Sequence, residues 1–175
     1  MAAAGRADLA ARVHRTAHLT GEFVLRSGAT STEYFDKYLF EADPALLREI
    51  AEGLRELVPD GVEALAGLEL GGVPLATVLS QLTGIPARFV RKQAKEYGTR
   101  RLAEGGELDG VRVAVVEDVV TSGGQLIESC RALREAGARI EGVLCVIDRE
   151  AGGRDNLAAE GLELRALFTA SDLRA

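Results

Sequence analysis

The sequence predicts an α/β protein with a mainly parallel, five-stranded core sheet flanked by helices. Short apolar runs of strand type alternate with helical patterns, and glycine or proline turns separate them. This order is typical of strand–helix–strand units. The chain has 175 residues, of which 47% are hydrophobic and 27% are charged. These values suit one globular domain that spans residues 1–175.

Five helices are predicted from the spacing of apolar residues and from capping residues. The clearest start is at Asp43, a good N-cap residue, which Pro44 follows at the first helical position. The clearest end is at Gly137, placed as a C′ glycine. The helices are expected over 8–18, 44–57, 74–82, 125–136 and 154–160.

The core strands are predicted from short runs of Val, Ile, Leu and Ala, which indicate strands buried on both faces. They are expected over 62–67, 87–90, 111–116, 140–147 and 163–168. A further short strand pattern covers 22–25. In a parallel sheet the carboxyl ends of the strands meet at one edge, and ligands bind there.

The most informative stretch is Val111–Gln125, which reads VRVAVVEDVVTSGGQ. A buried strand leads to the acid pair Glu117 and Asp118, and then to a hydroxyl- and glycine-rich turn that opens a helix. Amide groups at a helix start suit a phosphate, and carboxylates suit sugar hydroxyls or a divalent cation. The stretch therefore predicts a ribose 5-phosphate site. The alternative is a plain strand–turn–helix connection with a charged end.

A second glycine turn, Gly71 and Gly72, opens the helix over 74–82 and suits another anion in the same way. The loop 91–106 that follows the next strand carries five cations. It is either a solvated surface loop or hairpin, or a mobile lid suited to pyrophosphate. The chain has 18 arginines and 3 lysines, and two of the lysines, Lys92 and Lys95, lie in this loop.

Four of the eight aromatic residues lie within 34–40. They form either a small hydrophobic core or a platform on which a planar ring stacks. His14 and His18 are spaced four apart, but no third metal ligand accompanies them, so a helix surface is the expected setting.

Composition narrows the class of protein. The formal net charge of −6 argues against a nucleic-acid partner. No apolar run reaches the length of a membrane span, and the N-terminus lacks a signal-peptide core. Cys130 and Cys145 have no metal-ligand spacing and are expected to be reduced, which suits a cytoplasmic protein.

The stretch EDVVTSGGQ, with the apolar strand before it, resembles the motif of the type I phosphoribosyltransferases, which bind phosphoribosyl pyrophosphate (PRPP). Over almost its full length the chain is similar to the orotate phosphoribosyltransferases of this family. Three further segments carry that resemblance: FVLRSGATSTEYFDKY over 23–38, RKQAKEYG over 91–98 and DREAGGRDNL over 148–157.

The resemblance implies the type I fold with a small N-terminal hood, formed by residues 1–43, on the side of the base. It implies transfer of the phosphoribosyl group of PRPP to orotate in pyrimidine biosynthesis. The partners implied are PRPP, orotate and a second copy of the chain, whose site the lid reaches. The cofactor implied is Mg²⁺ carried by PRPP, with no metal ligands from the protein. Two alternatives are a phosphoribosyltransferase for another base and a non-catalytic PRPP sensor.

The same resemblance assigns roles to individual residues. Orotate is expected to contact Thr121, Arg149, Arg26, Tyr34 and Phe35. The residues expected to take part directly in catalysis are Arg91, Lys92, Lys95 and Asp118. PRPP is expected to contact Gly71, Gly72, Arg91, Lys92, Lys95, Tyr97, Glu117, Asp118, Val119, Val120, Thr121, Ser122, Gly123, Gly124 and Gln125.

Two positions depart from the pattern of the family. Tyr97 stands where the loop usually has histidine, and a tyrosine does not titrate near neutral pH. Arg26 stands where many relatives have lysine, which keeps the charge and changes the geometry of the donors.

Overall fold

The computed structural model describes residues 3–24, 28, 30–92 and 102–174. Its centre is a six-stranded sheet in the order β5-β4-β3-β6-β7-β8. Five strands run parallel, whereas β5 pairs antiparallel with β4 at one edge. The strands are β3 (Ala64–Leu68), β4 (Ala87–Val90), β5 (Ala103–Glu104), β6 (Arg112–Val120), β7 (Arg139–Asp148) and β8 (Leu164–Thr169).

The five predicted core strands are confirmed, and the sheet has one strand more than predicted. The extra strand, β5, comes from the end of the basic loop, and its antiparallel pairing with β4 agrees with the hairpin alternative for this segment. Its two residues carry no periodic pattern. Arg91 N–H donates to the Leu102 carbonyl at 2.9 Å, and β5 forms where this second limb of the loop returns along β4.

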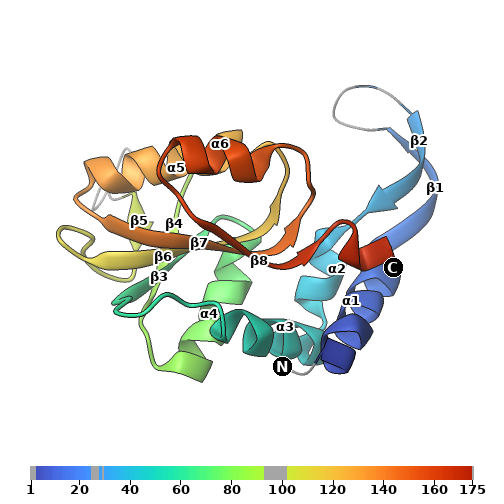
Figure 1. The fold of residues 1–175 in the computed structure, drawn as a ribbon, viewed down its shortest axis with the longest axis horizontal. Coiled ribbons are helices and arrows are strands. Elements are labelled where there is room, and N and C mark those ends of the chain that lie inside the picture. The colour runs from blue at the N-terminus through green and yellow to red at the C-terminus, as the bar shows by residue number, and fades with distance from the viewer. Residues whose placement is uncertain (1–2, 25–27, 29, 93–101, 175) are drawn as a thin grey trace.

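Helices cover both faces of the sheet (Figure 1). On one face lie α1 (Ala3–Ala17), α2 (Lys37–Ala42), α3 (Pro44–Arg55) and α4 (Gly72–Thr83). On the other face lie α5 (Gly124–Glu135) and α6 (Gly153–Ala159). Two buried apolar clusters correspond to these two layers. A short 3-10 helix, η1 (Asp172–Arg174), ends the described chain.

The predicted helix starts are largely confirmed. The Asp43 carboxylate accepts hydrogen bonds from the amides of Ala45 and Leu46, both at 3.0 Å, so it caps α3 as expected. The six-residue helix α2 was not predicted, because it is too short to show a helical period. Phe40 on α2 is fully buried in the first apolar cluster.

Within the predicted hood, residues 1–43, a separate antiparallel hairpin of β1 (His18–Val24) and β2 (Thr30–Phe35) stands off the body of the molecule (Figure 1). β1 begins directly after α1, four residues before the predicted strand. The aromatic residues within 34–40 lie in two different settings. Phe40 is core, whereas Tyr34 and Tyr38 are exposed.

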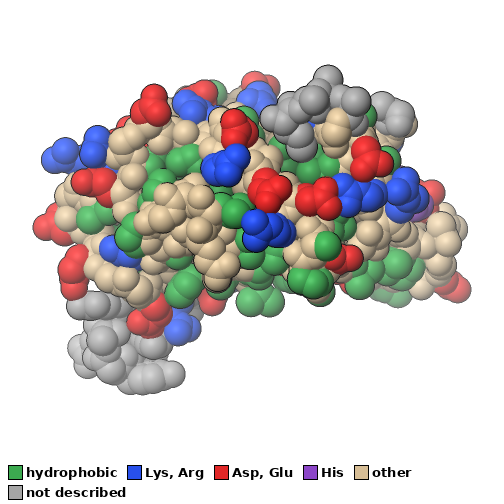
Figure 2. Space-filling view, turned by 90° about the horizontal axis from the view of Figure 1, so that it is seen from below, with side chains coloured by type: hydrophobic (Ala, Val, Ile, Leu, Met, Phe, Trp, Pro, Cys, Tyr) green, Lys and Arg blue, Asp and Glu red, His purple; other side chains and the backbone are tan. Residues whose placement is uncertain are grey.

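The face that carries α3 and α4 has an ordinary charged surface. Figure 2 shows basic and acidic side chains interspersed over it. Arg12 of α1 pairs with Glu49 of α3, and Arg48 pairs with Glu52 within α3. Ion pairs at the surface contribute little to stability. Among the described residues, no helix is both long enough and apolar enough to cross a membrane.

Candidate active site

The candidate site lies at the carboxyl edge of the parallel strands, where the loops after β3, β4, β6 and β7 meet. The two glycine turns form its floor. The first turn follows β3 and is packed tightly against β6: a Cβ on Gly72 would lie 2.2 Å from the Val116 carbonyl oxygen. Only glycine fits there, and the start of α4 is thereby held beside the acid pair on β6.

The second turn, after β6, leaves open space for an anion. Gly123 has φ +78°, the left-handed conformation that favours glycine. A Cβ on Gly124, the first residue of α5, would meet no atom within 4 Å. Thr121 and Ser122 are exposed. Amide and hydroxyl groups at this helix start are thus open to solvent, which a phosphate site requires.

The acid pair lies inside β6, not after it as predicted, because the strand continues to Val120. The Asp118 side chain is buried, and its Oδ2 lies 2.5 Å from Lys37 Nζ. Glu41 on α2 is the third carboxylate. A Cβ built on Gly71 would lie 1.6 Å from Asp118 Oδ2 and 2.8 Å from Glu41 Oε1, so both carboxylates lie close to this glycine. Three carboxylates and one lysine thus form a cluster at the first turn, in which Glu41 and Asp118 are buried and Glu117 and Lys37 are partly exposed.

Burial of this carboxylate cluster (Lys37, Glu41, Glu117 and Asp118) changes its proton affinities. Loss of solvent, reinforced by the nearby charge of Asp118, raises the pKa of Glu41 to about 9 and that of Glu117 to about 8. Both carboxyl groups therefore hold a proton at neutral pH. The site would otherwise carry three negative charges in a confined space.

A base-side pocket of about 460 Å³ lies between the hairpin, the loop after β7 and η1. Tyr34, Phe35 and Arg149 line it, and the Arg149 guanidinium carbon lies 5.9 Å from the centre of the Phe35 ring. The other residues that line it are His14, His18, Ser31, Glu33, Ala170, Leu173 and Arg174. The pocket offers a planar aromatic wall and a cation, which suits a flat, anionic ring.

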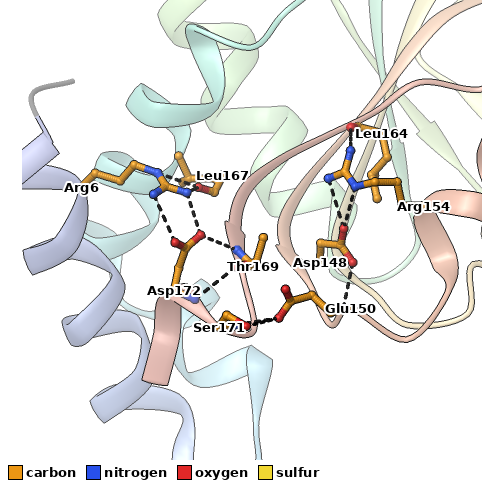
Figure 3. A network of polar contacts seen from close by, with 9 residues as sticks. All are labelled: Arg6, Asp148, Glu150, Arg154, Leu164, Leu167, Thr169, Ser171 and Asp172. Carbon is orange, nitrogen blue, oxygen red and sulfur yellow. Dashed lines mark hydrogen bonds and ion pairs between the residues drawn. The ribbon is translucent and has the colours of Figure 1, made fainter. Parts of the chain in front are cut away.

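A polar network holds the loop that carries Arg149 (Figure 3). The Arg149 amide donates to the Val120 carbonyl at 2.8 Å. Glu150 has φ +56°, an uncommon conformation for a residue with a side chain. Its carboxylate accepts hydrogen bonds from the Ser171 amide and hydroxyl at 2.8 and 2.6 Å, and its own amide donates to Asp148 at 2.9 Å. These contacts fix the backbone on both sides of Arg149.

The network extends to the first helix through η1 (Figure 3). Arg6 on α1 donates to the Asp172 carboxylate at 2.8 Å and to the Leu167 carbonyl. Asp172 also accepts from the Thr169 amide at 2.8 Å. The base-side pocket is therefore held by residues from both ends of the described chain.

Comparison with known proteins gives the family. Residues 40–163 match the phosphoribosyl transferase domain family. An orotate phosphoribosyltransferase of Nocardioides is 55% identical over 97% of this chain and 94% of its own, and that of Halobacterium salinarum is 50% identical over 87% of each. The chain belongs to the orotate phosphoribosyltransferase family.

Solved structures of orotate phosphoribosyltransferases have the same fold. The Mycobacterium tuberculosis enzyme in complex with Fe(III) dicitrate superposes with a TM-score of 0.88 at 36% identity, and it covers 97% of this chain and 99% of its own. The same enzyme in complex with PRPP gives a TM-score of 0.83 at 33% identity, with the same coverage. The predicted type I fold and the resemblance are confirmed.

The structure brings most of the predicted site residues to one edge of the sheet. Gly71, Gly72, Glu117, Asp118 and the turn Thr121–Gln125 lie together. Val119 is partly buried in the first apolar cluster and Val120 is buried in the second, so only their backbone is available to PRPP. Arg149, Tyr34 and Phe35 line the base-side pocket. Lys95, Tyr97 and Arg26 lie outside the described residues.

The start of the predicted lid, which the structure describes as far as Lys92, is hydrogen-bonded next to the first glycine turn. The Lys92 amide donates to the Glu69 carboxylate at 2.5 Å, and Arg91 faces Glu104 at 3.5 Å. Glu69 precedes the turn, after β3. Two residues of the carboxylate cluster were not among the predicted site residues. No motif marks Glu41, whereas Lys37 lies within the segment 23–38 that carries the resemblance and is one of three lysines in the chain.

The raised pKa values predict that stability falls as pH rises. In the unfolded chain these carboxyl groups ionise near the ordinary value of 4.5, whereas in the folded protein they ionise near 8 and 9. The folded state therefore binds more protons between these limits, and raising the pH through this window destabilises it. One proton contributes at most about 1.4 kcal/mol per pH unit.

We expect the melting temperature to decrease from about pH 6 to about pH 8.5, as measured by thermal unfolding at constant ionic strength. Glu41→Gln cannot ionise, so it should flatten this dependence. A slope that is the same in Glu41→Gln and in the wild type would show that Glu41 does not hold the proton.

The polar network predicts a specific effect on orotate. Glu150→Ala removes the acceptor of two Ser171 hydrogen bonds and is expected to raise the KM for orotate about fivefold, equivalent to about 1 kcal/mol. The KM for PRPP should change less than twofold. Steady-state kinetics with each substrate varied in turn measures both values. Glu163→Ala removes a surface glutamate at the other end of β8 and serves as the control; an equal effect of both variants would contradict the positioning role.

Proposed function

We propose that the protein transfers the phosphoribosyl group of PRPP to orotate, with release of pyrophosphate, to give orotidine 5′-monophosphate in pyrimidine biosynthesis. One observation carries this proposal: Arg149 stands at the aromatic wall of the base-side pocket, at the same edge of the sheet as two glycine turns suited to phosphates. Orotate combines a planar ring with a carboxylate. The membership of the chain in the orotate phosphoribosyltransferase family supports the same conclusion.

PRPP is held at both of its ends. Its 5-phosphate binds at the turn Thr121–Gln125, where the free space above Gly124 lets the backbone approach the anion. Its ribose hydroxyls bind at Glu117 and Asp118, and its pyrophosphate lies at Gly71 and Gly72. The distance between the two anion sites is bridged by the sugar, which fixes the orientation of the anomeric carbon.

Mg²⁺ fits this site as an ion bound to PRPP, without ligands from the protein. Asp118, the most deeply buried carboxylate of the cluster, is paired with Lys37, and the pKa values of Glu41 and Glu117 are raised, so these side chains are poorly suited to bind the ion themselves. Hard oxygen ligands from the pyrophosphate and water suit this ion. When bound, it neutralises charge on the leaving pyrophosphate. Arg91, Lys92 and Lys95 of the lid supply further positive charge as the lid closes.

Orotate enters the base-side pocket with its ring against Tyr34 and Phe35. Its carboxylate meets the forked donors of Arg149, and Thr121 and Arg26 complete its contacts. The ring nitrogen then attacks the anomeric carbon while the bond from that carbon to the pyrophosphate oxygen breaks, and the N–H proton of orotate passes to an oxygen of the leaving pyrophosphate. Positive charge develops on the ribose ring, as in glycoside chemistry. The protein supplies no nucleophile; it orients both reactants and excludes water.

The proposal includes a homodimer in which the lid of one subunit reaches the site of the other, and a cytoplasmic location. The two buried, unpaired cysteines, Cys130 and Cys145, are compatible with a reducing compartment.

The direct test measures turnover of PRPP with each of a panel of bases in the presence of Mg²⁺. We expect product with orotate and none with uracil, adenine or hypoxanthine. If a different base were turned over instead, that base would be the acceptor in place of orotate. Tight PRPP binding without turnover of any base would favour the alternative of a non-catalytic PRPP sensor. The change in orotate absorbance on nucleotide formation gives a continuous assay.

A further inference from the structure

Lys37 enters the candidate site from the hood side. Lys37 is the first residue of α2, and its Nζ lies 2.5 Å from Asp118 Oδ2. The lysine side chain is 34% exposed, whereas that of Asp118 is 1% exposed. The ammonium group therefore stands between a buried carboxylate and the open part of the site.

The backbone around Lys37 is fixed. The carboxylate of Asp36 caps α2 by accepting a hydrogen bond from the Tyr38 amide at 3.1 Å. The Asp36 amide donates to the Ala17 carbonyl at the end of α1, at 2.8 Å. The Lys37 ammonium also lies 5.3 Å from the centre of the Tyr38 ring. These contacts direct the lysine toward β6 and limit the freedom that it would lose on binding a ligand.

The charge at this point favours an anion. Burial lowers the pKa of Lys37, but the hydrogen bond and the charge of Asp118 outweigh it, and the net shift is upward. Lys37 is therefore charged at neutral pH, while Glu41 and Glu117 hold protons. An ammonium group has three N–H donors, and one Asp118 oxygen lies beside it as the partner of an ion pair. The exposed part of the lysine side chain leaves room for a ligand on its other side.

The position of this ammonium group relates it to one end of PRPP. Asp118 Oδ2, which Lys37 contacts, lies 1.6 Å from the place that a Cβ on Gly71 would take. Lys37 thus stands where the first glycine turn meets the acid pair. In the proposed reaction, the bond between ribose and pyrophosphate lies at this junction.

We infer that Lys37 is a further PRPP-binding residue, whose ammonium group binds the pyrophosphate. The inference rests on the proposed function for the identity of the ligand. It gives the pyrophosphate a cation from the hood in addition to those of the lid, so the anion is held on two sides. The other reading is that Lys37 only neutralises buried Asp118 and touches no ligand.

Binding of inorganic pyrophosphate separates the two readings. Lys37→Met keeps most of the length of the side chain and removes the charge. We expect it to weaken pyrophosphate binding at least about tenfold, the usual effect of losing a charge-assisted hydrogen bond. Orotate binding should stay within twofold. Isothermal titration calorimetry measures both. Arg48→Met removes one exposed positive charge on α3 and should leave pyrophosphate binding unchanged. A folded Lys37→Met protein that binds pyrophosphate as tightly as the wild type would overturn the inference.

A second measurement uses the wild-type protein and does not depend on whether a variant folds. With three lysines in the chain, acetylation of each by acetic anhydride can be followed by mass spectrometry of the peptides. Saturating pyrophosphate should slow the acetylation of Lys37 at least about tenfold, whereas orotate alone should not. An equal rate with and without pyrophosphate would contradict a direct contact. Neither measurement requires turnover, so failure with orotate as the acceptor would overturn the proposed function alone.

Discussion

Replacement of Arg149 by alanine is expected to lower kcat/KM for orotate about 10- to 150-fold. Hydrogen bonds to a charged group contribute about 1.5–3 kcal/mol each, which corresponds to this range. Arg149 is exposed in the free protein, so the full effect develops only when the base and the lid exclude water from the pocket. Arg149→Lys should recover the charge but not the forked geometry, and should lie between alanine and the wild type.

Two controls make this prediction specific. Arg174 lines the same pocket but has no assigned contact with the orotate carboxylate. Arg174→Ala should therefore change kcat/KM less than about threefold, as expected for an exposed charge at a distance. The affinity of Arg149→Ala for PRPP, measured by calorimetry, should equal that of the wild type. If orotate turnover by Arg149→Ala were unchanged, orotate would not be recognised through its carboxylate at this position.

The same substitution at two glycines is expected to have opposite consequences. Gly72→Ala should destabilise the protein by about 1–3 kcal/mol, because its Cβ would lie 2.2 Å from a backbone carbonyl that cannot rotate away. For a chain of this length, this corresponds to a decrease in melting temperature of roughly 2–4 °C per kcal/mol. PRPP binding should fall as well, since the start of α4 must move.

Gly124→Ala should leave stability unchanged, because the added methyl group meets no atom of the protein within 4 Å. It should weaken PRPP binding about tenfold or more, since it fills the space through which the 5-phosphate approaches the backbone. Thermal unfolding and PRPP titration of both variants test the pair of predictions. If Gly72→Ala lost PRPP affinity while Gly124→Ala kept it, the 5-phosphate would not bind at the turn Thr121–Gln125.

The elements that could be predicted from sequence are those that local rules specify. The cap at Asp43 and Pro44 depends on neighbouring residues, and the buried strands depend on runs of apolar residues. The two glycine turns were predicted for the same reason. The requirement for glycine at position 72 has a different origin, however. A Cβ there would collide with the Val116 carbonyl oxygen, so the requirement comes from packing between β3, α4 and β6.

The parts that were not predicted depend on contacts between distant segments. α2 is only six residues long, and tertiary packing of Phe40 stabilises it. β5 exists because β4 offers it a partner. The carboxylate cluster joins Lys37 and Glu41 from α2 with β6, more than 75 residues later in the chain. No spacing within either segment reveals that they meet.

The close approach of Asp118 to Gly71 has a consequence for how this protein can evolve. Any side chain at position 71 would collide with the Asp118 carboxylate, and the same carboxylate is needed by Lys37. Positions 37, 71 and 118 are therefore expected to change together or not at all. A lineage that acquired a cation at position 71 would have to release Asp118 first, and could then dispense with the lysine at position 37. Substitutions transplanted singly between distant relatives should fail at these three positions even where each residue is acceptable in its own background.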